Sequence, residues 1–370
     1  MISHPNNGSG AMSEKIIWIL LGNKLGDNAQ AKRLGYALKN DFACTIETKQ
    51  IVYNQKHQLS NIKLQASLVS MVECESDDLD LTLTPDVVIF TGRRAVPVAR
   101  WIQKQSLCQH NKLTRLVAIG KPRAPYYWFD LLVSTRQYHL PKWIPNLVLN
   151  DFTLNRRDDS DGTDLPQHPS FNIQNKVVVV LLGGERSGFR IRTVEIERMI
   201  ATLKRYQENQ PSHCLRVVAS KSTPEKVLHR ISESVPGNVE LFAWNQADKP
   251  SYPMFLKEGD VFFVTEDSAS MMTEAVSTGK PVYLLELFQR KTERRYNPIY
   301  WLQKCLVLTV YAFGLYDPSR TVRLFTRQLL NTGRVTMYGE NPASKCSSQE
   351  ALSAMDQELQ NVVNKVKDLL

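Results

Sequence analysis

The feature that most constrains the fold of this chain is a series of short apolar runs, each ending near a glycine, a hydroxyl residue or a charged residue. In the first half of the chain they are residues 16–21, 87–91, 116–119 and 130–134. In the second half they are residues 176–182, 214–219, 239–243, 260–265 and 281–285. Such nearly continuous runs are typical of parallel strands that are buried on both faces.

Helical patterns lie between these runs. They cover residues 29–38, 97–105, 193–207, 224–232, 268–277, 318–330 and 347–370. The alternation of strand and helix predicts an α/β fold with two doubly wound, Rossmann-like domains that face a cleft.

The length of 370 residues, 42% of them hydrophobic, is enough for two hydrophobic cores. Residues 155–174 are polar and lack periodicity, so we predict an interdomain linker there. The remaining boundaries follow: a disordered tail at 1–14, an N-terminal domain at 15–154, a C-terminal domain at 175–310, and C-terminal helices at 311–370 that pack back on the N-terminal domain.

Basic charge is concentrated in one segment of the chain. The net charge is +9, and residues 87–150 hold ten lysines and arginines against a single acid, Asp130. This imbalance indicates a phosphate-bearing partner, an anionic membrane surface or, as the weaker alternative, nucleic acid; the other interpretation is a solvated surface. The six cysteines have no CxxC spacing, and no signal peptide or membrane span is apparent. We therefore expect neither a zinc site nor a disulfide framework, and a cytoplasmic location.

Two sets of loops in the first domain follow predicted strands, where ligands of open α/β sheets bind. Residues 22–30 form a strand-to-helix turn in which Asp27 is either a general base or the cap of the following helix. Residues 91–94 and 120–123 are basic loops. Their arginines either bind phosphate or only keep the surface soluble.

Two loops of the second domain have the composition of a phosphate site. Gly183 and Gly184 end a strand and lead through Arg186 towards a helix, which indicates either a phosphate site or a tight turn. Neither GxGxxG nor GxxxxGK[ST] is present, which counts against a dinucleotide-binding fold and a P-loop. In residues 219–224, Ser220 and Lys221 could hold a diphosphate, while Thr223 has the character of a helix cap before Pro224.

The most specific segment is residues 264–275. It brings hydroxyl groups and a helix N-terminus to the end of a buried strand, and Glu274 could accept hydrogen bonds from a ribose diol. Gly279 and Pro281 then end this helix and begin the next strand.

Together, these segments resemble the mitochondrial-fission-protein-like family of glycosyltransferases over residues 16–287. The matching motifs are GDNAQ at 26–30, GRR at 92–94, KPR at 121–123 with FDL at 129–131, LGG at 182–184, SKSTP at 220–224, TEDSASM at 265–271 with EA at 274–275, and GKPV at 279–282. Where the family usually has Asn-Pro-Tyr, this chain has Lys249-Pro250-Ser251-Tyr252, and Lys221-Ser222 replaces a usual arginine pair. Bacterial members look like lipopolysaccharide outer-core glycosyltransferases, and the fold is similar to that of GT-B enzymes.

The resemblance implies a nucleotide-sugar donor, expected to be a UDP-sugar, bound mainly by the second domain, with catalysis that uses neither a metal nor a cofactor. It implies a lipopolysaccharide core or related phosphorylated glycolipid as acceptor, an enzyme peripheral on the cytoplasmic face of the inner membrane, and no nucleic-acid partner. Asp27 becomes the candidate base. The expected acceptor-binding residues are Lys24, Gly26, Arg93, Arg94, Lys121 and Arg123. The expected donor-binding residues are Gly183, Gly184, Arg186, Ser220, Lys221, Phe242, Ala243, Thr265, Asp267, Ser268, Ser270, Met271 and Glu274.

By this analogy Glu274 binds the ribose, Ser268 and Ser270 the diphosphate, and the backbone at Phe242 and Ala243 the nucleobase. Whether the reaction inverts or retains the anomeric configuration stays open. Two other functions also stay open: a nucleotide-sugar epimerase on the same fold, and a non-catalytic scaffold that binds membranes or proteins through its basic face, with a helix expected near residues 301–315.

Overall fold

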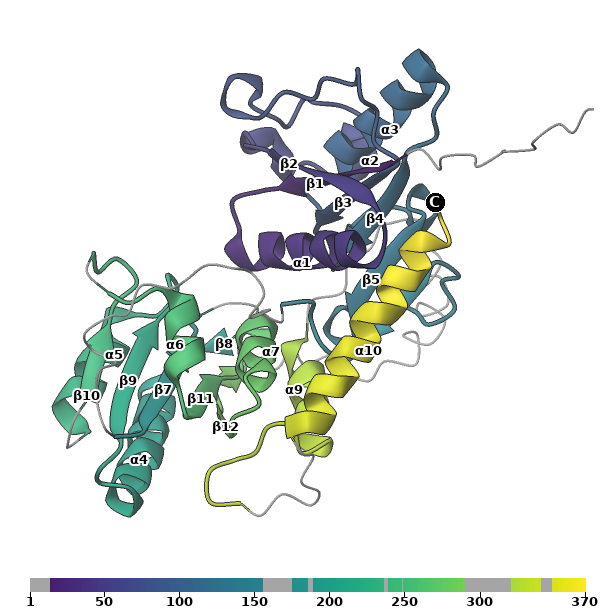
Figure 1. The fold of residues 1–370 in the computed structure, drawn as a ribbon. Coiled ribbons are helices and arrows are strands. Elements are labelled where there is room, and N and C mark those ends of the chain that lie inside the picture. The colour runs from purple at the N-terminus through teal and green to yellow at the C-terminus, as the bar shows by residue number, and fades with distance from the viewer. Residues whose placement is uncertain are drawn as a thin grey trace, which may run out of the picture. The chain divides into compact units, whose positions relative to one another are not determined.

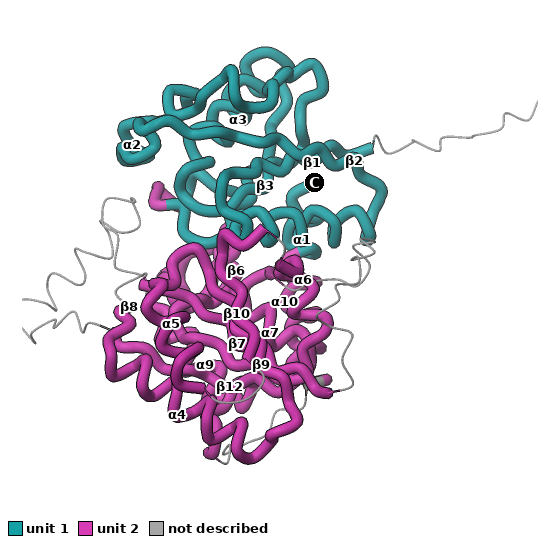
Figure 2. Tube along the Cα trace, turned by 90° about the vertical axis from the view of Figure 1, so that its left-hand side faces the viewer, with its two compact units in different colours: residues 1–122, 127–131, 363–370 teal, residues 123–126, 132–362 magenta. Residues whose placement is uncertain are grey.

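The computed structural model describes residues 14–155, 175–185, 189–235, 239–247, 249–289, 321–340 and 348–370. The expected tail up to residue 13, the linker from residue 156, Arg186 and the helix expected at 301–315 lie outside the described residues. The chain divides into two compact units, coloured separately in Figure 2. Unit 1 comprises residues 1–122, 127–131 and 363–370, and unit 2 comprises residues 123–126 and 132–362.

The first sheet has the strand order β2-β1-β3-β4-β5-β6 (Figure 1). Its strands are β1 (Lys15–Leu21), β2 (Cys44–Gln50), β3 (Val87–Thr91), β4 (Arg115–Ile119), β5 (Leu131–Thr135) and β6 (Leu147–Asn150). Two long helices pack on it: α1 (Leu25–Asp41) contacts β1, β2 and β3, and α3 (Val96–His110) contacts β3 and β4. Shorter elements are α2 (Asn61–Leu64) and the 3-10 turns at Gln55–Gln58, Glu73–Glu75, Tyr126–Trp128 and Arg136–Tyr138.

The second sheet has the order β10-β9-β7-β11-β12, and all of its strand pairs are parallel. Its strands are β7 (Val177–Leu182), β9 (Cys214–Ala219), β10 (Val239–Phe242), β11 (Val261–Thr265) and β12 (Val282–Leu285). The helices between them are α4 (Thr193–Asn209), α5 (Glu225–Ser234), α6 (Tyr252–Glu258) and α7 (Ala269–Ser277). Strands β8 (Phe189–Arg190) and β13 (Phe288–Gln289) form a small antiparallel pair.

Two further helices follow the second sheet in the chain. They are α9 (Val322–Asn331) and α10 (Ser348–Lys367). The helix that we predicted over residues 318–330 is observed from Val322 to Asn331, and residues 318–320 lie outside the described part of the chain.

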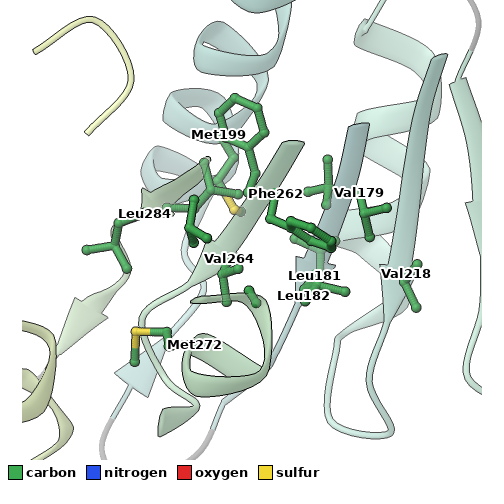
Figure 3. Close-up of a cluster of buried hydrophobic side chains, with 14 of the residues drawn as sticks. Val179, Leu181, Leu182, Met199, Val218, Phe262, Val264, Met272 and Leu284 are labelled. Atoms are coloured by element: carbon green, nitrogen blue, oxygen red, sulfur yellow. The ribbon is translucent and has the colours of Figure 1, made fainter. Parts of the chain in front are cut away.

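Continuous apolar strands account for the core of unit 2. All six residues of β7 are buried, and residues of β9, β11 and β12 pack beside them. Figure 3 shows this cluster, in which Met199 of α4 and Met272 of α7 contribute together with strand residues such as Val179, Phe262 and Leu284. Burial on both faces explains why these strands have no polar alternation.

The predicted α/β fold class is confirmed, with two doubly wound parallel sheets, and each predicted strand is found within one residue of its expected bounds. The strand order also locates the candidate sites. When the strands of the second sheet are numbered in chain order, their spatial order is 3-2-1-4-5, so the direction in which the chain adds strands reverses between β7 and β11. In the first sheet this direction reverses between β1 and β3. Ligands of open α/β sheets bind beyond the carboxyl ends of the strands at these reversal points.

Candidate functional site

The loops after β7 and β11 are bonded to each other at the reversal point of the second sheet. The Gly183 amide donates to Thr265 Oγ1 at 2.7 Å, and the Gly184 amide donates to Asp267 Oδ2 at 2.9 Å. The Thr265 hydroxyl in turn donates to Asp267 Oδ1 at 2.7 Å. Thr265 and Asp267 are buried. Both glycine amides, which we expected to face a phosphate, are therefore satisfied inside the protein, and Asp267 and Thr265 hold the two loops together.

The paired glycines are required by the close approach of neighbouring loops. A Cβ atom on Gly184 would lie 1.9 Å from the backbone oxygen of Ser222, and a Cβ atom on Gly183 would lie 2.0 Å from Asp267 Oδ1. The sequence indicated a close backbone approach here, and the structure shows that the approaching groups belong to the protein itself.

The turn after β9 supplies polar groups to the same edge of the sheet. Thr223 Oγ1 donates to the Gly183 carbonyl at 2.6 Å and accepts from the Ser220 amide at 2.9 Å. The prediction of Thr223 as helix cap is wrong by one residue, because α5 begins at Glu225 with Pro224 at the cap position. Ser220 Oγ and Ser222 Oγ lie 3.1 Å apart, and Lys221 is exposed beside them.

Helix α7 begins directly after this cluster. Ser268 is its cap and accepts from the Met271 amide at 3.4 Å, so its hydroxyl stabilises the helix start. Ser270, in the first turn, is half-buried. Because the amides of a first helical turn carry partial positive charge, this end of α7 favours an anionic group.

Glu274 lies one turn further along α7 and is bonded to the start of α6. Its Oε2 accepts a hydrogen bond from the Tyr252 hydroxyl at 2.8 Å. Burial raises the pKa of Glu274 to about 7, and the hydrogen bond from Tyr252 opposes this shift in part. A carboxyl group with a pKa this far above its usual value, in a helix that begins at the carboxyl end of a parallel strand, is a candidate functional residue.

The loop after β10 was expected to contact the nucleobase through its backbone. Phe242 is buried, with its ring centroid 4.9 Å from that of Phe255, so only its backbone could reach a ligand. The carbonyl of Ala243 accepts a hydrogen bond from Lys249 Nζ. Sequence reasoning did not assign a role to Lys249.

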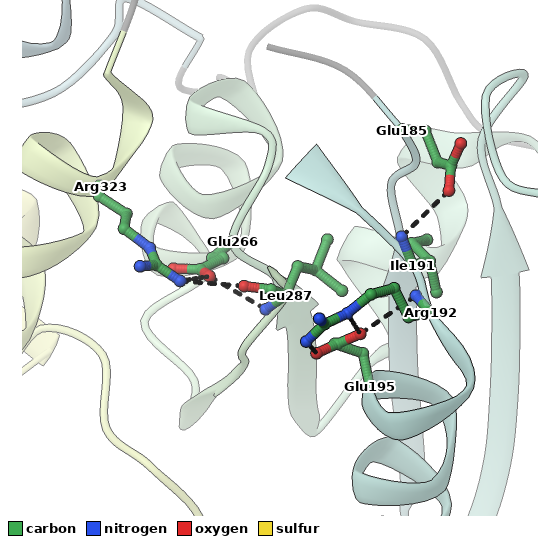
Figure 4. Close-up of polar contacts among 7 residues, drawn as sticks. All are labelled: Glu185, Ile191, Arg192, Glu195, Glu266, Leu287 and Arg323. Carbon is green, nitrogen blue, oxygen red and sulfur yellow. Dashed lines mark hydrogen bonds and ion pairs between the residues drawn. The ribbon is translucent and has the colours of Figure 1, made fainter. Parts of the chain in front are cut away.

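A partly buried ion pair next to this site was also not predicted. Glu266, between Thr265 and Asp267, accepts from the Leu287 amide at 3.0 Å and from Arg323 Nη2 at 3.2 Å (Figure 4). Burial raises the pKa of Glu266, and Arg323 opposes the shift. The interaction fixes the loop after β11, and its partners are too far apart in sequence for any local pattern to reveal them.

A second charged cluster in Figure 4 fixes the start of α4. Arg192 donates to both carboxylate oxygens of Glu195 and stacks 3.5 Å from the ring centroid of Phe288. Glu185 accepts from the Ile191 amide at 3.2 Å. These contacts hold the segment that follows the Gly183 turn.

In unit 1, Asp27 lies at the reversal point between β1 and β3. Its side chain is 38% exposed and lies 3.6 Å from Lys24 Nζ, and its backbone oxygen accepts from Thr91 Oγ1 at 2.9 Å. Asp27 is not the cap of α1, as one interpretation had it, because Lys24 occupies that position. A Cβ atom on Gly92 would lie 3.9 Å from Asp27 Oδ2, so the loop after β3 passes beside this carboxylate.

The two predicted basic loops of unit 1 are brought together by one side chain. Asn61 Nδ2 donates to the backbone oxygens of Arg93 and Pro122, at 3.0 and 2.8 Å. Arg94 donates to Asn23 Oδ1 at 2.9 Å, and Lys121 is half-buried.

The remaining predicted acceptor residues differ in their surroundings. Gly26 is in the first turn of α1, where its backbone oxygen accepts from Gln30 Nε2 at 3.3 Å. Arg123 belongs to unit 2, where it is exposed and has a φ of 51°.

Within the described ranges, no group of three histidine, cysteine or acidic residues is arranged to hold a metal ion. Among the helices of the same ranges, none is both long and apolar enough to cross a bilayer.

Known proteins similar to this chain fall into two groups. A mitochondrial fission protein ELM1 of Arabidopsis thaliana is 28% identical over 225 residues, which are 54% of this chain and 51% of that protein. The chain thus spans about half the length of that relative. Among solved structures, a glycosyltransferase of Rickettsia africae is similar with a TM-score of 0.44 and 10% identity, covering 96% of this chain and 99% of that one. A UDP-GlcNAc 2-epimerase of Neisseria meningitidis, solved with UDP-GlcNAc, has a TM-score of 0.42 and 12% identity, covering 95% and 100%.

The family assignment depends on a longer match. Residues 26–357 match the family described as mitochondrial fission ELM1, and this range includes the loops after β3, β7, β9 and β11 as well as Glu274. The chain belongs to the mitochondrial fission ELM1 family.

Proposed function

We propose that this protein is a metal-independent glycosyltransferase that binds its nucleotide-sugar donor at the carboxyl edge of the second sheet. The observation that carries the proposal is the convergence of the Tyr252–Glu274 pair and the start of α7 beside the reversal point between β7 and β11. A carboxylate suits a ribose diol, and the amides of a helix start suit a diphosphate.

The chemistry needs the leaving group to be stabilised. When the bond between the anomeric carbon and the diphosphate breaks, negative charge grows on the phosphate oxygens. The first turn of α7, the exposed Lys221, and the hydroxyls of Ser220 and Ser222 are the groups that would face this charge. The Gly183 and Gly184 amides are already bonded and are left out of this role.

In an inverting reaction the acceptor hydroxyl attacks the anomeric carbon, a new glycosidic bond forms, and the nucleoside diphosphate leaves. A base must take the hydroxyl proton, and we assign this step to Asp27 of unit 1. Lys24 Nζ lies 3.6 Å from this carboxylate.

For the acceptor we propose a phosphorylated glycolipid of the lipopolysaccharide core type, reached by an enzyme peripheral on the inner membrane. The support is the pair of basic loops that Asn61 joins, which carry Arg93, Arg94 and Lys121. Arginine binds phosphate through two parallel hydrogen bonds, so these loops suit a phosphorylated acceptor.

The donor site is tested by thermal shift with UDP, GDP, ADP, dTDP and CMP. A nucleotide at about a hundred times its Kd stabilises the folded state by about 2.7 kcal/mol. We expect one nucleotide class to raise the melting temperature, and Glu274→Ala to weaken its binding at least about tenfold through the lost hydrogen bonds. Glu208→Ala, which removes an exposed carboxylate at the end of α4, should leave binding unchanged.

No shift with any nucleotide would overturn the donor site and favour a scaffold. Conversion of a UDP-sugar to its epimer in the absence of any acceptor would instead favour an epimerase.

A further inference from the structure

The loop after β10 presents an exposed aromatic side chain at the edge of the second sheet where ligands bind. Trp244 is 47% exposed, although tryptophan is usually buried over most of its surface. Because β10, β9, β7 and β11 are parallel, the loop after β10 emerges at the same edge as the turns after β7, β9 and β11. An exposed aromatic face at such an edge is a stacking surface for a planar ligand group.

A lysine ammonium lies over this ring and binds the loop backbone. Lys249 Nζ is 4.9 Å from the Trp244 ring centroid, and it donates to the carbonyls of Ala243 at 3.1 Å and Trp244 at 2.6 Å. The Ala243 carbonyl also accepts from the Gln246 amide at 3.3 Å, so both of its lone pairs are engaged. An ammonium has three N–H donors, and these two bonds leave one for a ligand.

The chain connects this lysine to the proposed ribose site. Tyr252, whose hydroxyl donates to Glu274, follows Lys249 by three residues. The Cα atoms of two residues that are three apart in sequence lie at most about 11 Å from each other, which is short enough for one nucleoside to contact both Lys249 and Tyr252.

We propose that Trp244 stacks on the nucleobase and that Lys249 selects bases with an oxygen at pyrimidine C4 or purine C6 over bases with an amino group at that position. Uracil, thymine and guanine present an oxygen that can accept from the ammonium. Cytosine and adenine present an amino group at the same position, which would meet a donor and the saturated Ala243 carbonyl. The inference rests on the proposed function, since it requires the nucleotide to bind at this edge.

The test compares UDP with CDP, two nucleotides whose bases differ in the oxygen or amino group at one ring position. Titration calorimetry should show that the wild type binds UDP at least about tenfold more tightly than CDP. The reason is that the Lys249 ammonium can donate a hydrogen bond to the oxygen of uracil but not to the amino group of cytosine. GDP should exceed ADP in the same way. Lys249→Met keeps the length and apolar stem of the side chain but removes the donor, and it should bring each of the two ratios close to one.

Two further variants make the test specific. Lys257→Met, which replaces an exposed lysine on α6, should keep the wild-type ratio of UDP to CDP affinity. Trp244→Leu should weaken the binding of every nucleotide by about tenfold. It should leave the ratio of UDP to CDP affinity unchanged, since stacking does not distinguish uracil from cytosine.

The outcomes separate this inference from the donor site itself. Equal wild-type affinity for UDP and CDP, or an unchanged ratio in folded Lys249→Met, would overturn the assignment of Lys249 while the donor site stands. If Lys249→Met melts below the assay temperature, the wild-type ratio and Trp244→Leu decide the matter. Absence of binding by all four nucleotides would overturn the donor site and this inference together.

Discussion

Glu274 is a side chain whose charge changes near neutral pH. Its folded-state pKa is about 7, against an ordinary value of 4.5, so the folded protein holds this proton more tightly than the unfolded chain does. The stabilising contribution of Glu274 is therefore complete below about pH 4.5 and is lost as pH rises through about 7.

We expect the difference in unfolding free energy between the wild type and Glu274→Gln to fall by about 2 kcal/mol from pH 5 to pH 8. Urea denaturation at both pH values measures it. Taking the difference removes the contribution of other titrating groups, which both proteins share. A difference that stays flat with pH would show that the folded protein does not perturb this carboxyl group.

Only some of the contacts of individual residues in the candidate site were predictable from the sequence. Glycine pairs and hydroxyl-rich turns in the sequence correctly marked where the backbone comes close to another group at Gly183 and Gly184. Sequence could not show that the partners are Ser222 and Asp267 rather than a phosphate, because both possibilities require the same small residue. Lys249 was missed because a lysine in an irregular loop has no periodicity that indicates its target.

Among the elements, helix α10 fixes the segment that follows β6. The Glu358 carboxylate accepts from the amides of Asp151 at 2.7 Å and Phe152 at 3.1 Å, and burial raises its pKa to about 7. The next residue of that segment, Thr153, donates through its hydroxyl to Thr273 Oγ1 of α7 at 2.9 Å. The segment is therefore held by two helices that are distant in sequence.

Glu358→Ala should lower the free energy of unfolding by about 2 kcal/mol, because it leaves two amides without their charged acceptor. Gln357→Ala, at the exposed neighbouring position, serves as the control and should have little effect. Both are measured by chemical denaturation at pH 8, where Glu358 is mostly charged. Equal stability of the two variants would mean that the hydrogen bonds of Glu358 contribute little to stability.

Strands differ in how well the sequence predicts them, and the reason is burial. Central strands such as β7 and β11 are apolar on both faces and were located to within one residue. Strand β2 was missed because, as an edge strand, it alternates exposed and partly buried residues and contains two threonines, a lysine and a glutamate. Strand β6, at the other edge, is only four residues long and mostly half-buried.

For the whole molecule, the net charge of +9 and the basic segment at 87–150 predict salt-dependent binding to anionic membranes. We expect the protein to sediment with vesicles of phosphatidylglycerol and phosphatidylcholine, to bind pure phosphatidylcholine poorly, and to be released by 0.5 M salt, a concentration on the order that screens surface charge. Arg93→Glu combined with Arg94→Glu should weaken binding at least about tenfold.

The matched control combines Lys226→Glu with Lys257→Glu, which changes the net charge equally at exposed positions of α5 and α6. If this control weakens vesicle binding as much as the double arginine variant, only the net charge matters and the basic loops have no special role.

Unit 1 combines segments that are far apart in the sequence, and this affects how it folds during synthesis on the ribosome. This unit contains residues up to 122 but also residues 363–370, among which Lys367 forms an ion pair with Asp41 of α1. At about 5–20 residues per second, tens of seconds separate the translation of these two parts. During that interval the nascent first unit lacks residues 363–370, in which Val363 and Val366 are buried in the folded protein, so chaperones that bind apolar surface should contact it until this segment has been synthesised.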